Sequence, residues 1–172
     1  MWSDIVLIAV LIICVGTDLH RRKIYNAVTF PALALALTLH FWFGGWSGLG
    51  ASLAGFAAGI GLLLIPYFMG GMGAGDVKLL SVIGALKGSW FVVTAAVYMG
   101  LIGAAMAVVT LLLRKDSRAF FKQVVYFLYA FRCGTRMSFP KNTGALTAVM
   151  PYGVAIGGGA LTAILTRGDI PI

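Results

Sequence analysis

The sequence contains no glutamate, and its acidic residues are five aspartates in a chain of 172 residues. Lysine and arginine together number 13, which gives a formal net charge of +8. Any chemistry that depends on carboxylates must therefore use a short set of side chains. That set is Asp4, Asp18, Asp76, Asp116 and Asp169.

Cysteine and histidine are also scarce, with two of each in the chain. Cys14 and Cys133 stand alone and form no CxxC pair, which excludes a zinc ribbon and a disulfide scaffold. His20 and His40 have no neighbouring residues that indicate a metal site. We therefore expect neither a metal ion nor another cofactor.

Charge is sparse overall, because only 10% of the residues are charged whereas 60% are hydrophobic and the mean hydropathy is +0.98. These values predict an integral membrane protein rather than a soluble domain. Lysine and arginine in such a protein usually mark cytoplasmic loops, so the basic balance does not predict a nucleic-acid partner. We expect one all-α transmembrane domain over residues 1–172.

Apolar runs place the expected spans, each needing roughly 20 residues. The segment 77–88 is ambiguous, because its 12 residues are too few for an ordinary span and include Lys78 and Lys87. If it crosses the membrane, loops 19–26 and 114–142 both face the cytoplasm, and their three and seven basic residues make ten of the 13. Six spans with both termini outside are therefore predicted, at about 2–18, 27–43, 49–69, 76–88, 89–113 and 143–166.

The cytoplasmic loop 114–142 has a helical pattern of its own. Apolar side chains recur at helical spacing beside basic ones, which predicts a basic amphipathic helix on the inner leaflet. Two roles stay open for it: an anchor on anionic lipid, or a part in holding substrate. The residues concerned are Phe120, Val124, Leu128 and Phe131, with Arg118 and Lys122.

The predicted topology sorts the five aspartates. Asp4 and Asp169 fall at the outer ends, and Asp116 lies in a basic loop where it has cationic neighbours. Asp18 closes the first helix and Asp76 opens the fourth, so both are expected at the inner membrane boundary. They are the two acids that can share a site.

Two carboxyl groups are what peptide hydrolysis by carboxylates requires: an anion that takes a proton from water and a protonated partner that polarises the carbonyl. A close pair provides both states, because like charges resist ionising together. Asp18 lies near a helix C-terminus, which disfavours the anion, and Asp76 near an N-terminus, which favours it. We therefore assign Asp18 as the acid and Asp76 as the base.

Other interpretations of these residues stay open. Asp76 follows a glycine-rich stretch and could be a helix N-cap, and Asp18 could form an interfacial ion pair with Arg21 or Arg22. Ionisable groups at membrane depth also serve as proton relays, so a small proton-coupled transporter is an alternative function. A scaffold for a secretion machine is a third.

Three motifs, in order along the chain, carry a resemblance to a known family. The segment Gly73–Leu80 (GAGDVKLL) resembles the GxGD signature of type IV prepilin peptidases. Asp18 followed by Ile24–Asn26 is similar to the first-aspartate motif of that family, and Met150–Gly153 (MPYG) is similar to its last-helix motif. Tyr25 and Val154 depart from the family pattern, which commonly has proline at these positions.

The resemblance implies that Asp18 and Asp76 are catalytic. It adds supporting motif residues, namely Gly73, Gly75, Lys78, Asn26, Pro151 and Gly153. The two glycines before Asp76 permit a close approach of the backbone. For Lys78 two roles stay open, because it can pair with an acidic residue near the cleavage site of the substrate or extend to the membrane interface.

The function implied by the resemblance is that of an aspartyl endopeptidase in the bacterial inner membrane. It would cut the basic leader of pilin precursors after a glycine, at the cytoplasmic face. Its partners would be a prepilin or pseudopilin and membrane lipid, and the pilus assembly machinery is a further candidate. The chain lacks the cysteine-rich insertion of the larger enzymes, which also N-methylate, so we expect a peptidase without methyltransferase activity, similar to those serving Flp-type (Tad) pili.

Overall fold

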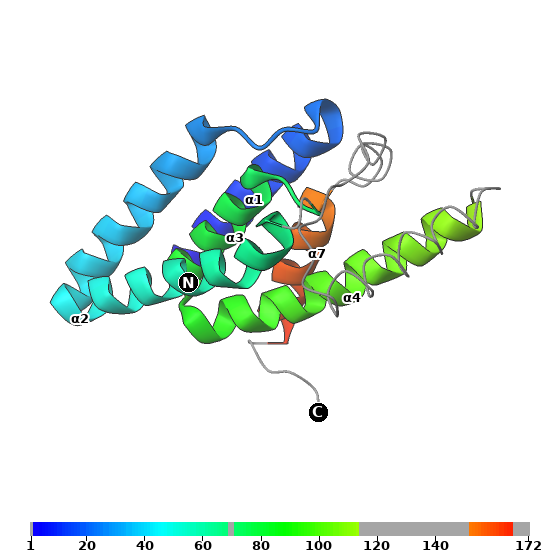
Figure 1. Cartoon of the computed structure of the whole chain (residues 1–172). Coiled ribbons are helices and arrows are strands. Elements are labelled where there is room, and N and C mark those ends of the chain that lie inside the picture. Colours follow the sequence, from blue (N-terminus) through cyan, green and yellow to red (C-terminus); the bar gives the residue numbers. More distant parts are fainter. Residues whose placement is uncertain (1, 69–70, 114–151, 167–172) are drawn as a thin grey trace. The chain divides into compact units, whose positions relative to one another are not determined.

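The computed structural model describes residues 2–68, 71–113 and 152–166, which form helices joined by short connections and contain no strand. The all-α class expected from the sequence is therefore confirmed for the part of the chain described. The basic loop 114–142 and Pro151 lie outside the described residues. The helices are α1 (Trp2–Arg21), α2 (Asn26–Phe68), α3 (Ala74–Lys87), α4 (Ser89–Leu113) and α7 (Tyr152–Leu165), as Figure 1 shows.

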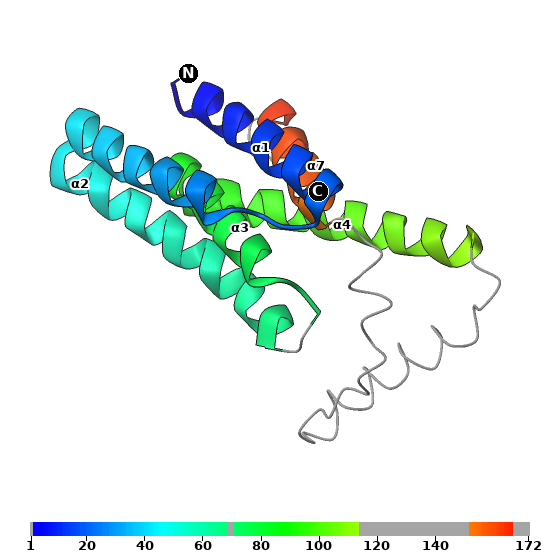
Figure 2. The ribbon, with the colours of Figure 1, turned by 90° about the horizontal axis from the view of Figure 1, so that it is seen from above.

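One compact unit holds both aspartates of interest. It comprises residues 2–102 and 152–166 of the described chain, and the end of α4 from Gly103 belongs to a second unit. Within the first unit α1 contacts α7, and Figure 2 shows the two helices next to each other. That the whole chain forms a single domain stays a prediction.

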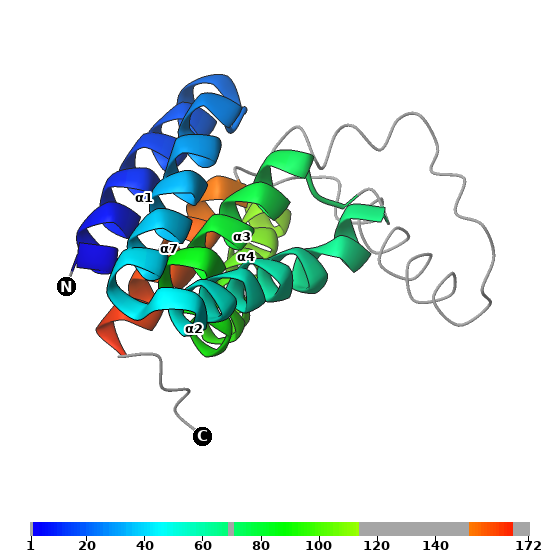
Figure 3. The same ribbon diagram turned by 90° about the vertical axis from the view of Figure 1, so that its left-hand side faces the viewer.

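The long helix α2 folds back on itself at Gly45. This residue has φ 58° and ψ −145°, a conformation that glycine adopts without steric cost. Two legs result, 26–44 and 46–68, which form the hairpin visible in Figure 3. They correspond to the spans expected at 27–43 and 49–69, but the linker expected between them is reduced to one residue with non-helical dihedral angles.

The short helix α3 packs against α2 and also contacts α1 and α7. All residues from Leu79 to Leu86 are buried. Glycine allows the close approach: a Cβ added at Gly59 would lie 2.6 Å from the Cα of Ser81, and a Cβ added at Gly55 would overlap the backbone oxygen of Gly84. A helix so well covered by protein needs no long apolar run, which explains why its 14 residues, about 21 Å in length, look ambiguous as a span.

The direction of α3 agrees with the predicted crossing. Asp76 lies in its first turn, and Lys87 in its last turn forms an ion pair of 2.6 Å with Asp4, at the start of α1. The helix therefore runs from the end of the unit that holds Asp18 to the end that holds Asp4. Among the residues that the structure describes, the helices α1, α2 and α4 are long and apolar enough to cross a membrane, and α7 is a shorter apolar helix. The count of six spans stays a prediction.

Candidate active site

Asp18 and Asp76 line the same cavity, of about 360 Å³, at one end of the unit. Asp18 comes from the end of α1 and Asp76 from the start of α3. A single water molecule occupies roughly 30 Å³ in the liquid, so the cavity has room for a water and part of a peptide. The other lining residues are Arg22, Lys23, Ile24, Tyr25, Asn26, Gly73 and Gly75.

The carboxylate of Asp18 is held by the start of α7. Its side chain is 7% exposed, and its Oδ2 accepts a hydrogen bond of 2.9 Å from the backbone N–H of Gly153. A Cβ added at Gly153 would lie 2.6 Å from that oxygen, so the contact requires glycine. Within the described residues Asp18 forms no ion pair with Arg21 or Arg22, the alternative considered from the sequence.

The carboxylate of Asp76 is held by its own helix terminus. It is 8% exposed, and its Oδ2 accepts a hydrogen bond of 3.1 Å from the N–H of Gly73. Gly73 is the N-cap residue of α3 and Asp76 the third residue of the helix, so Asp76 is not itself the N-cap. Its carboxylate nevertheless accepts the backbone N–H of Gly73 at the N-terminus of α3. The interpretation of Asp76 as a capping residue is therefore correct in part.

The two carboxylates thus have matching surroundings. In each, Oδ2 accepts a backbone N–H at a helix N-terminus, whereas Oδ1 has no hydrogen-bond partner among the residues described. The start of α7 offsets the unfavourable position of Asp18 near the C-terminus of α1. Helix position therefore does not distinguish the acid from the base, and our assignment of those roles stays a prediction without that support.

The connection between α1 and α2 forms one wall of the cavity. Arg22 has φ 52°, and its N–H donates to the backbone oxygen of Asp18 at 2.8 Å, which ends α1. The chain then passes through Ile24, and a Cβ added at Gly75 would lie 3.0 Å from the Cβ of Ile24. Glycine at position 75 thus lets this connection approach the start of α3. Sequence reasoning missed Arg22 and Lys23 as lining residues, although they lie between two motif positions.

Two further motif residues meet at the edge of the cavity. Asn26 is the first residue of α2, and its Oδ1 accepts a hydrogen bond of 2.9 Å from Nζ of Lys78. Lys78 also lies 5.5 Å from the ring centroid of Phe30. Of the supporting residues predicted from the sequence, Gly73, Gly75 and Asn26 line the cavity. Gly153 contacts it through Asp18, and Pro151 lies outside the described residues.

Metal-binding groups do not gather in the part of the chain that the structure describes, where no three His, Cys or Asp side chains are close enough to hold an ion. His40 instead lies within 3.2 Å of the backbone oxygen of Leu86, far along α3 from Asp76. The titratable side chains that line the cavity are the two carboxyl groups of Asp18 and Asp76, with Arg22, Lys23 and Tyr25 beside them.

Apolar helices around a cavity with two buried carboxylates define a helical membrane protein with a candidate acid–base pair. The chain belongs to the type IV leader peptidase family, which it matches over residues 5–113, more than half of its length. It is accordingly a protease of the prepilin peptidase kind, with prepilins as substrates. The match includes Asp18 and Asp76 and ends before Gly153. No curated protein and no solved structure matches the chain significantly.

Proposed function

We propose that this leader peptidase is an intramembrane aspartyl endopeptidase that uses Asp18 and Asp76 to cut the basic leader of Flp-type prepilins after a glycine. The observation that carries the proposal is that both carboxylates are buried in one cavity, each with Oδ2 anchored and Oδ1 without a partner among the described residues. The anchored oxygen fixes the orientation of each group, and the other oxygen is left for proton transfer.

The reaction then needs one proton shared between the two carboxyl groups. The ionised carboxylate takes a proton from water while the water oxygen attacks the carbonyl carbon of the scissile peptide bond. The protonated partner gives its proton to the carbonyl oxygen, which produces a neutral tetrahedral intermediate. When the C–N bond breaks, the first group protonates the leaving nitrogen and the second recovers a proton from the intermediate, so both return to their starting states.

The cytoplasmic face of the inner membrane is the proposed site of cleavage. His20 and Arg21 occupy the last turn of α1, and Arg22 and Lys23 follow, all at the end of the unit where Asp18 lies. Basic residues next to a span favour the cytoplasmic side. A carboxylate pair at that boundary would meet the bond between the basic leader and the apolar helix of a precursor.

The test is cleavage of a co-expressed Flp-type prepilin by the full chain in membranes. Wild type, Asp18→Asn and Asp76→Asn are compared at matched protein levels by gel shift and amino-terminal sequencing. We expect the wild type to cut after the leader glycine and each variant to lose activity by at least about 1,000-fold, because neither half of the reaction can proceed alone.

Asp4→Asn is the matched control, because it removes a carboxylate from the opposite end of α1 and leaves the cavity unchanged. It should cut at a rate within about twofold of wild type, as expected for a change remote from the chemistry. Normal cleavage by either Asp18→Asn or Asp76→Asn would show that the pair is not the catalytic centre. It would also reopen the alternatives of a transporter or a scaffold.

A further inference from the structure

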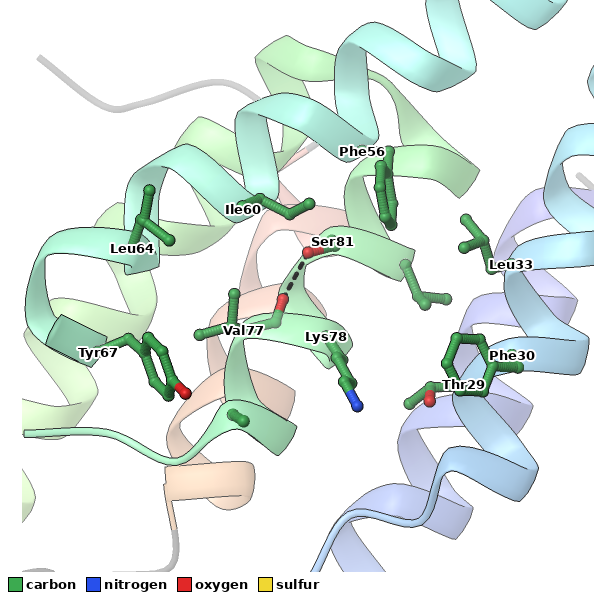
Figure 4. A pocket seen from close by; sticks show the side chains of 12 residues that line it. Thr29, Phe30, Leu33, Phe56, Ile60, Leu64, Tyr67, Val77, Lys78 and Ser81 are labelled. Atoms are coloured by element: carbon green, nitrogen blue, oxygen red, sulfur yellow. Dashed lines mark hydrogen bonds between the residues drawn. The ribbon is translucent and has the colours of Figure 1, made fainter. Parts of the chain in front are cut away.

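An open apolar groove lies between the two legs of α2 and helix α3. Leu33 comes from the first leg, Phe56, Ile60 and Leu64 from the second, and Val77 from α3, as Figure 4 shows. Its volume is about 320 Å³, at the lower end of the range for ligand pockets. Such a groove can take several apolar side chains of a helix laid along it.

This groove adjoins the candidate active site. Val77 in its wall directly follows Asp76, and Lys78, which also lines it, hydrogen-bonds to Asn26 at the edge of the catalytic cavity. A chain whose scissile bond reaches the two aspartates can therefore continue into the groove. The part of a prepilin that follows that bond is its apolar helix, and its chemistry fits the groove walls.

Polar groups are placed at the end of the groove nearest the aspartates. Lys78 is exposed there, and within the described residues its hydrogen bond partner is the neutral amide of Asn26 rather than a carboxylate. Thr29, which lines the same groove, has a buried hydroxyl with no hydrogen-bond partner in the part of the chain described. Buried polar groups are rarely left unsatisfied, so the Thr29 hydroxyl is suited to a further hydrogen-bond partner in the groove. The ammonium group of Lys78 is exposed and is bonded to a neutral amide, so it can still pair with a carboxylate that enters from outside.

We propose that this groove is the docking site for the apolar helix of the prepilin, and that Lys78 recognises a carboxylate near the start of that helix. The inference rests on the proposed function, since it assigns the groove to the same substrate. Lys78 is then a specificity residue: it positions the substrate through an ion pair and takes no part in proton transfer.

Site-specific cross-linking tests the docking independently of catalysis. Leu64 and Leu62 are neighbours on α2 with exposed fractions of 38% and 39%, but Leu64 lines the groove and Leu62 does not. Each is replaced in turn by a photoreactive benzoyl-phenylalanine in the Asp76→Asn background, in membranes that contain the prepilin. We expect an adduct with the prepilin from position 64 and none from position 62.

Two outcomes of that experiment would overturn the docking proposal. The first is equal adduct formation from both positions, which would mean that the prepilin contacts this face of α2 without using the groove. The second is adducts with lipid alone at position 64, which would assign the groove to an acyl chain. Neither outcome bears on the catalytic pair, which is tested by cleavage with Asp18→Asn and Asp76→Asn.

A double-mutant cycle tests the role of Lys78. Lys78→Met is measured against prepilins in which each acidic residue in the first two turns after the scissile bond is replaced by its amide. We expect Lys78→Met to raise KM by about fivefold with kcat little changed, as for an exposed ion pair. Replacement of one acidic residue of the prepilin by its amide should raise KM equally for the wild-type enzyme and should not raise it further for Lys78→Met. Lys78→Arg should keep the wild-type KM. Additive losses for every substrate, or a fall in kcat alone, would refute this role.

Discussion

The backbone N–H of Gly153 donates a hydrogen bond of 2.9 Å to Oδ2 of Asp18, which joins the start of α7 to the end of α1. The two residues are 135 positions apart in the sequence. This contact fixes the orientation of a buried carboxylate that would otherwise be free to rotate in the cavity. Its geometry leaves no space for a side chain at position 153.

We therefore expect Gly153→Ala to reduce cleavage strongly. The added Cβ would lie 2.6 Å from Oδ2 and 2.9 Å from Cγ of Asp18, so the carboxyl group must move. A displacement of about 1 Å at a reacting group can cost about 100-fold in rate, and we expect a loss of that order. The measurement is the initial rate of prepilin cleavage in membranes.

Gly16→Ala is the control for that variant, because Gly16 lies in α1 close to Asp18 and nothing would lie within 4 Å of its Cβ. Alanine in a helix is favoured over glycine by up to about 1 kcal/mol, so this variant should fold and cut as well as wild type. If Gly153→Ala were equally active, the hydrogen bond to Asp18 would have no part in the reaction.

The sequence predicts this site better than it predicts the contacts that hold it. Asp18 and Asp76 could be paired in advance, because the predicted topology puts Asp4 and Asp169 at the outer ends and Asp116 among basic neighbours in a loop. The hydrogen-bond donors to these aspartates could not be predicted. Gly153 reaches Asp18 only because α7 packs against α1, and no local sequence pattern indicates that packing. The assignment of acid and base was limited in the same way. It used the dipole of the helix that carries each aspartate, and it could not include the dipole of α7, which reaches Asp18 only in the folded protein.

The fold shows a similar division. Hydropathy predicts α1, the two legs of α2 and α4 because each carries a long run of apolar residues, many of which are exposed on the surface of the protein. The sharp turn at Gly45 was expected as a longer linker, since several glycines and a serine surround it and the sequence does not show which one takes the positive φ. Helix α3 is buried by protein over Leu79–Leu86, so its composition reflects packing more than membrane thickness.

The contact between α2 and α3 leads to a prediction about stability. A Cβ added at Gly84 would overlap the backbone oxygen of Gly55, and both partners are main-chain atoms that cannot turn aside. Forced overpacking typically costs about 1–3 kcal/mol. We expect Gly84→Ala to lower the midpoint of thermal unfolding in detergent by several degrees. The unfolding is measured by circular dichroism.

Gly61→Ala provides the comparison, because this glycine lies in α2, as Gly55 does, and its Cβ would have nothing within 4 Å. That variant should unfold at the wild-type temperature or slightly above it. Equal stability of Gly84→Ala and Gly61→Ala would indicate that α2 and α3 are further apart than their glycines imply.

The ion pair between Lys87 and Asp4 ties α3 to α1 at the end opposite the candidate active site. Both side chains are partly exposed, at 20% and 33%, so the pair should contribute at most about 1 kcal/mol. We expect Lys87→Met to lower the unfolding midpoint by a few degrees and to leave kcat for cleavage within about twofold of wild type. The combined change with Asp4→Asn should cost less than the sum of the two single losses, and additive losses would show that the two side chains do not interact in the membrane.

The last prediction concerns the new amino terminus that cleavage creates. The chain contains Cys14 and Cys133 but no paired cysteines, so it lacks the cysteine-rich insertion found in the larger enzymes that its motifs resemble and that also methylate. We therefore expect the mature pilin to carry an unmodified amino group. Mass spectrometry of the amino-terminal peptide, from cells in which this chain is the sole source of leader peptidase, measures this directly. A methylated terminus would contradict this expectation. If Asp18→Asn, which should not cleave, still methylates a pilin supplied already cleaved, the chain has a second activity.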